Sequence, residues 1–149
     1  MKPLEEGRLV KRDSLKVSGV IPAGPEAVYK AWLDDKEHGE MTETPAAQIS
    51  ARVGGKFIAG GGYMRGTTLE LDPPRKIVQS WRTTEFSEDA PDSRLEVTLE
   101  KTEGGTKITI VQTEIPAGKG TSLRQASIDY YFTPMKRYFA ARSAKGAER

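Results

Sequence analysis

The chain contains a single histidine, His38, which lies in an acidic segment, DDKEHGE. Asp34, Asp35, Glu37 and Glu40 surround it, and a metal site or an acid–base group could use such a set. One histidine cannot form a two-histidine metal site, and the absence of cysteine excludes thiolate catalysis and cysteine-ligated zinc. The HGE triplet matches half of a zinc deaminase signature, but the P-C-x-x-C half is absent. The polar flanks are more typical of a helix end with solvated charges, so we predict no metal, no cofactor and no catalytic residue here.

Serine and the loop carboxylates give no clearer catalytic pattern. No serine lies in a G-x-S-x-G nucleophile elbow. Glu88, Asp89 and Asp92 lack the order of acidic residues that forms a calcium loop. The sequence therefore favours a protein that is not an enzyme, and an activity built on Tyr63 or Glu70 inside a cavity stays open as an alternative.

A glycine-rich stretch, VGGKFIAGGGYMRG at 53–66, has to be tested as a phosphate-binding loop. Gly61 and Gly66 have the spacing of the outer P-loop glycines, but Thr67 follows where that motif has lysine. A dinucleotide fingerprint fails because its last glycine is replaced by Arg65. The next residues, TTLELDPP, alternate as a strand does, whereas a phosphate loop opens a helix. We therefore predict a tight hairpin at 54–55 and a turn or bulge at 60–62.

Length and charge limit the classes of partner. A chain of 149 residues is most simply one domain. Its net charge of +2 is uneven, because residues 119–149 hold seven Lys or Arg against two acidic residues. No basic stretch is interleaved with aromatic residues, so we expect no nucleic-acid partner. No apolar run approaches the roughly 18 residues of a membrane span, so we expect no membrane insertion and a cytoplasmic location.

The periodicity of apolar residues predicts one strand, a short helix, about six further strands and a long helix. Residues 14–21 alternate as a half-buried strand, and a helix should begin at Pro25. Strands are expected near 46–52, 56–60, 63–72 and 76–83, then at 94–101 and 106–115. Beyond residue 120 the period changes to 3.6, and Pro134 should bend this helix near residues 130–134.

Four segments together carry a resemblance to a known family: RVGGKF at 52–57, LELDPPRKIVQSWR at 69–82, GGTKITIVQTEIP at 104–116 and DYYFTPMKRYF at 129–139. They resemble the domain related to the C-terminal half of the activator of the heat shock protein ninety ATPase, in the START-like (SRPBCC) superfamily. The resemblance implies an α+β helix-grip fold, in which a curved antiparallel sheet of six to seven strands wraps around a long C-terminal helix. We expect an N-terminal extension at 1–13, the START-like domain at 14–142 and a flexible tail at 143–149.

The resemblance also implies a cavity between the sheet and the last helix, which holds a small hydrophobic or amphipathic ligand in relatives. In this chain the expected walls are large apolar side chains, and segments 34–44 and 84–93 are expected to gate the cavity. These residues are Trp32, Met41, Phe57, Tyr63, Trp81, Tyr131 and Met135. The alternative function is a module that binds and stimulates an ATP-driven chaperone through Lys136 and Arg137, with the domain a monomer or homodimer.

Overall fold

The strands of this protein form because apolar residues alternate with polar ones over long stretches. The computed structural model describes residues 12–147, with side chains through residue 142. The elements are β1 (Arg12–Ile21), α2 (Pro25–Leu33), α3 (Asp35–Thr42), β2 (Gln48–Ile49), β3 (Lys56–Ala59), η1 (Gly60–Gly62), β4 (Met64–Asp72), β5 (Lys76–Thr83), β6 (Ser93–Thr102), β7 (Gly105–Pro116), α4 (Gly120–Ser127), η2 (Ile128–Phe132) and α5 (Thr133–Ala147).

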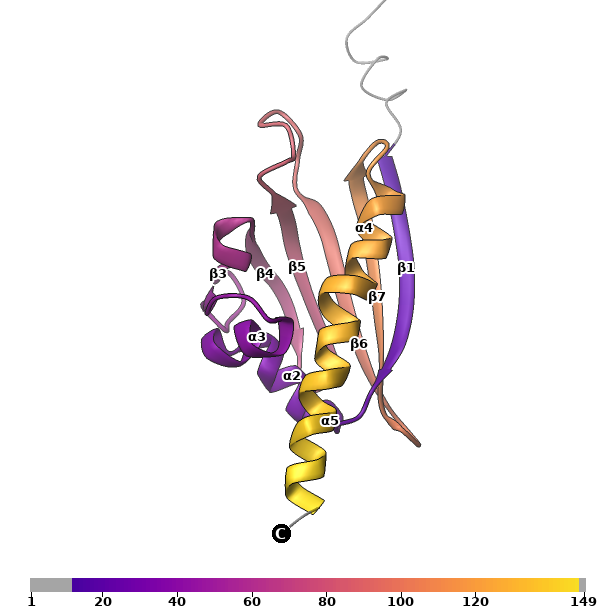
Figure 1. The fold of residues 1–149 in the computed structure, drawn as a ribbon. Helices are drawn as coiled ribbons and strands as arrows, with labels where there is room; N and C mark the ends of the chain where they lie inside the picture. The colour runs from indigo at the N-terminus through magenta and orange to yellow at the C-terminus, as the bar shows by residue number, and fades with distance from the viewer. Residues whose placement is uncertain (1–11, 148–149) are drawn as a thin grey trace, which may run out of the picture.

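The seven strands pair in the order β1-β7-β6-β5-β4-β3-β2, and every neighbouring pair is antiparallel. Figure 1 shows that the sheet curves and that the C-terminal helix crosses its concave face, with α2 and α3 beside the helix. The predicted helix-grip fold is therefore confirmed. In this order the first two strands of the chain, β1 and β2, form the two edges of the sheet.

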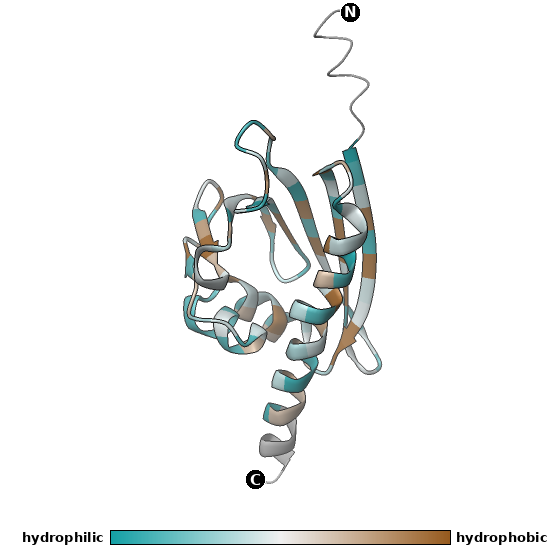
Figure 2. Ribbon diagram, turned by 45° about the horizontal axis from the view of Figure 1, so that its top comes forward, coloured by the Kyte–Doolittle hydropathy of each residue, from teal (hydrophilic) through white to brown (hydrophobic). Residues whose placement is uncertain are grey.

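One face of the sheet supplies the core. On β6, Leu95, Val97 and Leu99 are buried, and on β7 Ile108 and Ile110 pair with Leu99 and Val97 in register. Figure 2 shows these apolar positions as brown bands alternating with polar ones along the strands. Each buried aliphatic side chain of this size contributes about 1.5–3 kcal/mol to folding, so the alternation fixes which face meets the helix.

The C-terminal helix is anchored to β1 at two places. Asp13 Oδ2 accepts hydrogen bonds from the backbone N–H groups of Gly118 (2.9 Å) and Gly120 (2.8 Å), which satisfies donors at the start of α4. Further along, a Cβ on Gly19 would lie 3.0 Å from the Phe132 ring, so the glycine gives this ring room to pack on the strand. These contacts fix how the helix lies across the sheet.

Where a bend was predicted near Pro134, the helix contains a π-helical turn, η2. Proline has no N–H to donate, and in a straight helix its ring would collide with the carbonyl of Tyr130, four residues earlier. The chain instead donates the Thr133 N–H to the Ile128 carbonyl, five residues back. This turn ends at Phe132, so Tyr130 and Tyr131 lie within it.

Several predicted boundaries are wrong. The expected strand at 46–52 is reduced to Gln48–Ile49, and the turn that follows spans residues 50–55 rather than a two-residue hairpin at Gly54-Gly55. Only Gly54 of that pair has a positive φ, 85°. The glycines at 60–62 form η1 between β3 and β4, as the turn prediction required. Helix α5 continues to Ala147, into the segment expected to be a tail, and most of the expected N-terminal extension lies outside the described residues.

Candidate functional site: an aromatic pocket under the C-terminal helix

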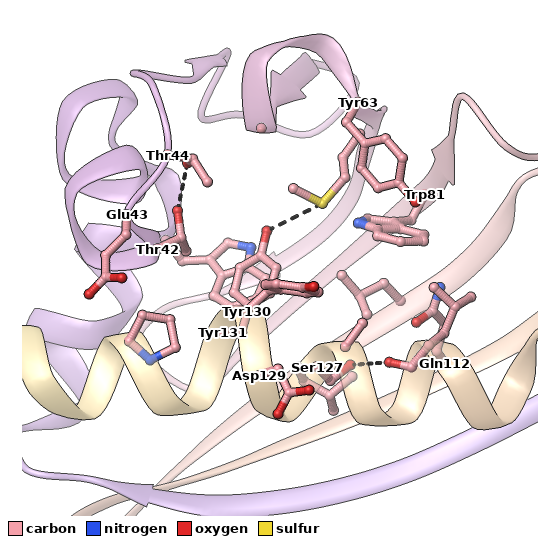
Figure 3. A pocket seen from close by; sticks show the side chains of 18 of the residues that line it. Thr42, Glu43, Thr44, Tyr63, Trp81, Gln112, Ser127, Asp129, Tyr130 and Tyr131 are labelled. Atoms are coloured by element: carbon pink, nitrogen blue, oxygen red, sulfur yellow. Dashed lines mark hydrogen bonds between the residues drawn. The ribbon is translucent and has the colours of Figure 1, made fainter.

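A pocket with a volume of about 640 Å³ lies between the concave face of the sheet and the α4–η2 part of the C-terminal helix. Figure 3 shows the side chains that line it. The sheet contributes Trp81, Leu95, Ile110 and Gln112, and the helix contributes Leu123, Ala126, Ser127, Tyr131 and Pro134. The end of α3 and the η1 turn close the remaining sides. The pocket therefore has the size of a small-molecule site and mainly apolar walls.

The inner wall is formed by Trp32 and Tyr131, which belong to a cluster of three rings from three helical elements; the third ring, His38, lies outside the pocket lining. The rings of Trp32 (α2) and Tyr131 (η2) are stacked, with centroids 4.9 Å apart and planes 25° from parallel. His38 (α3) meets both rings edge-on, at 5.4 Å from Trp32 and 5.6 Å from Tyr131. A stacked aromatic pair contributes about 0.5–1.5 kcal/mol beyond the area it buries. The cluster therefore ties the C-terminal helix to the two short helices.

Both ring nitrogens of His38 make hydrogen bonds. Nδ1 lies 2.7 Å from the carbonyl oxygen of Trp32, which can only accept, so Nδ1 carries a proton. Nε2 lies 3.0 Å from the Tyr131 hydroxyl. Burial lowers the pKa of His38, and the hydrogen bond to Trp32 opposes that effect less strongly. His38 is therefore neutral at pH 7, and its Nε2 accepts a hydrogen bond from the Tyr131 hydroxyl.

The acidic residues Asp34, Asp35 and Glu40 that flank His38 are exposed, as predicted, but His38 itself is buried. The side chain is only 4% exposed, because α3 turns His38, Met41 and Thr42 inward while its acidic residues face solvent. Asp34 caps this helix by accepting the Glu37 N–H at 2.8 Å. With both nitrogens engaged, His38 acts as a support for the ring cluster rather than as a free ligand for a metal.

Trp32 is also held from the sheet side. Its indole N–H donates to the side-chain oxygen of Gln79 at 3.3 Å, and the Gln79 amide donates to Thr68 Oγ1 at 3.3 Å. Gln79 and Thr68 are buried, so this series of hydrogen bonds satisfies side-chain donors and acceptors whose burial without a partner would lower the stability. The indole N–H of Trp32 is thus already paired and is not available to a ligand.

The floor of the pocket contains a second fixed polar chain. The Gln112 side-chain amide donates to Ser93 Oγ at 2.9 Å, and Ser93 Oγ donates to the Trp81 carbonyl at 2.7 Å. Gln112 is 2% exposed and lines the pocket. Because its nitrogen is held by Ser93, its side-chain oxygen is the atom left to accept a hydrogen bond from an occupant.

The rim joins α3 to the C-terminal helix. Glu43, which ends α3 in the left-handed conformation with φ 59°, lines the pocket and pairs with Arg137 at 3.0 Å through a bidentate contact. Further along, the Tyr138 hydroxyl donates to Glu37 at 2.9 Å. Burial, followed by this hydrogen bond to Glu37, raises the pKa of Tyr138 to about 12. Two side-chain contacts therefore hold α3 against α5.

The opposite rim is the loop between β5 and β6, which Arg82 ties down. Its guanidinium donates to the carbonyls of Ala90 (2.9 Å) and Ser87 (2.8 Å) and pairs with Asp92 at 2.9 Å. Glu85 of this loop lines the pocket. The segment expected to be a gate is thus braced from within by a single side chain.

The structure brings together four of the seven residues predicted to line the cavity. Trp32, Tyr63, Trp81 and Tyr131 line the pocket. The other three point inward but do not line the pocket: Met41 and Met135 are 0% exposed and Phe57 is 6% exposed, and all three pack in the hydrophobic core. Periodicity indicates which side chains point inward, but it does not distinguish the core from the wall of a cavity inside that core.

The two residues predicted to bind a partner differ in their surroundings. Lys136 is exposed on α5. Arg137 is also exposed, but it forms an ion pair with Glu43, which lines the pocket, so substituting Arg137 would also change the pocket rim. Residues that the prediction missed include Thr42, Gln112, Ser127, Asp129 and Tyr130. The only sequence signal for the last two was their place beside Pro134, where the helix was expected to bend.

Comparisons with known proteins agree with this architecture. The model of the family described as "Activator of Hsp90 ATPase homolog 1-like protein" matches residues 22–140. The chain belongs to this family. A human member of the activator of Hsp90 ATPase homolog 1-like family, the activator of 90 kDa heat shock protein ATPase homolog 1, is 29% identical over 115 residues, which are 77% of this chain and 33% of that protein. The Dictyostelium discoideum homolog is 30% identical over 105 residues, 69% of this chain and 27% of that protein.

Solved structures show the same fold. An Hsp90 activator from Plasmodium falciparum superposes with a TM-score of 0.67 at 25% identity, covering 77% of this chain and 85% of that one. The protein CalU16 from Micromonospora echinospora gives 0.65 at 21% identity, covering 91% and 83%. The chain thus spans about a third or less of the length of the curated activators it matches, whose family it shares. Across the described residues, no helix has the length and apolar character needed to cross a bilayer.

Proposed function

We propose that this domain binds a small hydrophobic or amphipathic molecule in the pocket between its sheet and its C-terminal helix. The observation that carries the proposal is the volume of about 640 Å³ enclosed by aromatic and aliphatic side chains. Pockets for small organic ligands have volumes of roughly 300–1,000 Å³ and mostly apolar walls with a few fixed polar groups. Gln112 is such a group, because its side-chain amide donates to Ser93 Oγ, which in turn donates to the backbone carbonyl of Trp81, so it is fixed before a ligand arrives.

The pocket wall is also preorganised. Trp32 is held by Gln79, and Tyr131 is held by the ring stack and by His38. A wall that is already ordered loses little side-chain entropy when a ligand binds. The two tryptophans of the chain, Trp32 and Trp81, both line the pocket, so intrinsic fluorescence reports on this site.

The test fills the pocket from the helix. Ala126 faces the pocket from α4, so Ala126→Phe should occupy part of its volume, whereas Ala140→Phe adds the same ring to the exposed face of α5. The neutral probe N-phenyl-1-naphthylamine should bind the unmodified protein saturably and quench tryptophan emission. We expect Ala126→Phe to weaken binding at least about tenfold and Ala140→Phe to leave it unchanged. Equal binding by both variants would place the probe elsewhere and contradict the proposal.

A second candidate function is regulation of an ATP-driven chaperone, and membership of the activator family favours it. On this hypothesis the exposed Lys136 contributes to docking on an acidic partner surface. Arg137 is a poorer probe because its substitution would release Glu43 at the pocket rim. Electrostatic contacts at a rim of this kind act mainly on association rate and on salt dependence.

The chaperone hypothesis is tested by ATP turnover of a purified Hsp90 with and without this protein. The hypothesis is supported if this protein stimulates ATP turnover and Lys136→Glu reduces that stimulation. Lys107→Glu, at an exposed position of β7, should leave the stimulation unchanged. No change in turnover, together with no binding in a sedimentation or calorimetric assay, would remove it. Ala126→Phe should not alter stimulation, since the pocket and the docking surface are separate in this hypothesis.

A further inference from the structure

The charged residues that line the pocket all have the same sign. Glu43, Glu85 and Asp129 are acidic, and within the described part of the chain no lysine, arginine or histidine lines the pocket. This is notable in a protein whose net charge is +2 and whose C-terminal helix is basic. The basic side chains of that helix, such as Lys136, are exposed and lie outside the lining.

The carboxylates are not equally compensated. Glu43 is neutralised by its bidentate contact with Arg137. Asp129 accepts a hydrogen bond from the neutral Gln125 amide at 3.0 Å, and no ion pair is formed by Asp129 among the described residues. Glu85 is exposed on the β5–β6 loop, and among the described contacts only its backbone N–H is engaged, by Thr83. Two uncompensated negative charges therefore lie at the mouth of an otherwise apolar pocket.

Aromatic rings line the same space. Trp32, Trp81 and Tyr131 form inner walls, and Tyr63 and Tyr130 stand at the rim with 40% and 68% of their surfaces exposed. Figure 3 shows Tyr63, Trp81, Tyr130 and Tyr131 around one opening. The faces of such rings carry negative potential and attract cations, especially alkylated ammonium groups that carry a weakly held hydration shell. Aromatic walls and acidic rim therefore favour the same kind of occupant.

The buried polar groups are also mainly acceptors. The Tyr131 hydroxyl proton is committed to His38, and the Trp32 N–H is committed to Gln79. Gln112, which is 98% buried, presents its side-chain oxygen because Ser93 holds its amide nitrogen. The donors that the described hydrogen bonds leave over include the indole N–H of Trp81 and the second amide hydrogen of Gln112. A ligand that donates hydrogen bonds or carries positive charge is therefore matched better than an anion, which would face carboxylates and unoccupied acceptors.

We infer that the pocket selects aromatic or amphipathic organic cations, with the ammonium group near Glu85 and Asp129 and the apolar body between the tryptophans. This inference rests on the proposed ligand-binding function and adds the charge class of the ligand. An ammonium group over a partly desolvated ring gains about 0.5–2 kcal/mol, which corresponds to roughly 2- to 30-fold in affinity. One exposed carboxylate near the ammonium group increases the affinity for the cation by a further factor of about two to five.

The experiment compares three benzene derivatives of similar size that differ in charge. Phenyltrimethylammonium is positively charged, tert-butylbenzene is its neutral isostere, and benzenesulfonate is an anion of similar bulk. Binding is followed by tryptophan fluorescence and by calorimetry at low and at physiological ionic strength. We expect the cation to bind about tenfold more tightly than the neutral isostere, and the anion to bind most weakly.

The carboxylates are then neutralised one at a time. Glu85→Gln and Asp129→Asn should each weaken the cation about two- to fivefold and leave tert-butylbenzene unchanged. Glu103→Gln, in the exposed β6–β7 hairpin and outside the pocket, is the matched control and should leave both affinities unchanged. These residues are exposed, so the variants are expected to fold.

The outcomes separate the two proposals. Equal or tighter binding of tert-butylbenzene than of the cation overturns the charge selectivity and leaves ligand binding standing. The charge selectivity is also overturned if Glu85→Gln and Asp129→Asn do not reduce the preference for the cation, because the ammonium group would then interact with other residues. Failure of all three compounds to bind, together with failure of N-phenyl-1-naphthylamine, overturns both proposals.

Discussion

The burial of His38 leads to a specific prediction about pH. Its pKa in the folded protein is lowered from the ordinary value of 6.5, first by burial. Above pH 6.5 the side chain is neutral in both the folded and the unfolded state, and it adds no pH dependence. As the pH falls below 6.5, His38 becomes protonated in the unfolded chain but stays neutral in the folded protein. The free energy of unfolding therefore decreases until the pH reaches the pKa of His38 in the folded protein.

The size of the effect follows from that linkage. Each pH unit between 6.5 and the folded pKa lowers the stability by up to about 1.4 kcal/mol. Protonation would also put donors on both ring nitrogens, so the Tyr131 hydroxyl would have to stop donating to Nε2 and accept from it instead. The ring cluster therefore contributes its full stability above pH 6.5 and loses part of it under mild acid.

The assay uses the fact that His38 is the only histidine. Its Cε1–H resonance gives an unambiguous NMR titration curve, which should have a midpoint below 6.5. Urea unfolding between pH 7.5 and 5.5 should show a larger loss of stability in the unmodified protein than in His38→Gln, where the carboxylates still titrate but the imidazole is gone. A midpoint at or above 6.5, or parallel pH profiles for the two proteins, would refute the buried, neutral state of His38.

Two other substitutions test the packing around the site. Gly66→Ala should unfold the β4–β5 pair or cost more than about 3 kcal/mol, because the added Cβ would collide with the backbone carbonyl oxygen of Ser80. Gly24→Ala is the control: its Cβ would meet only the flexible Glu26 side chain at 3.4 Å, so it should be nearly neutral in thermal unfolding. Arg137→Glu should lower the free energy of unfolding by at most about 1 kcal/mol, because both partners of its ion pair with Glu43 are more than half exposed. In a double-mutant cycle, adding Glu43→Arg should restore the lost stability. A double variant as unstable as the single variant would show that the pair is not formed.

Much of the fold was predictable because alternation and 3.6-residue periodicity report directly on which face of an element is buried. The long helix followed from such signals, and where a bend was predicted near Pro134 the helix contains the π-helical turn that holds Tyr130 and Tyr131. Short elements were less predictable: β2 has two residues, too few for a pattern. Their position depends on contacts from distant segments.

The site was predictable only in part, for a physical reason. The same apolar side chain serves in a core or in a cavity wall, so Met135 and Tyr131 could not be separated by their spacing on one helix. His38 was missed because its neighbours in the sequence are acidic, whereas its neighbours in space are Trp32 and Tyr131, which lie six and 93 residues away. The acceptor role of Gln112 likewise depends on Ser93, which reaches it only through the pairing of β6 with β7.

The central claim is that the space between the sheet and the C-terminal helix holds a ligand, and isotope-filtered NMR on a complex tests it most directly. With N-phenyl-1-naphthylamine bound to labelled protein, intermolecular NOEs should connect the probe to the rings of Trp32 and Trp81 and to Ala126. Binding accompanied by NOEs only to residues outside the pocket would contradict the account. So would binding that leaves both indole resonances unchanged.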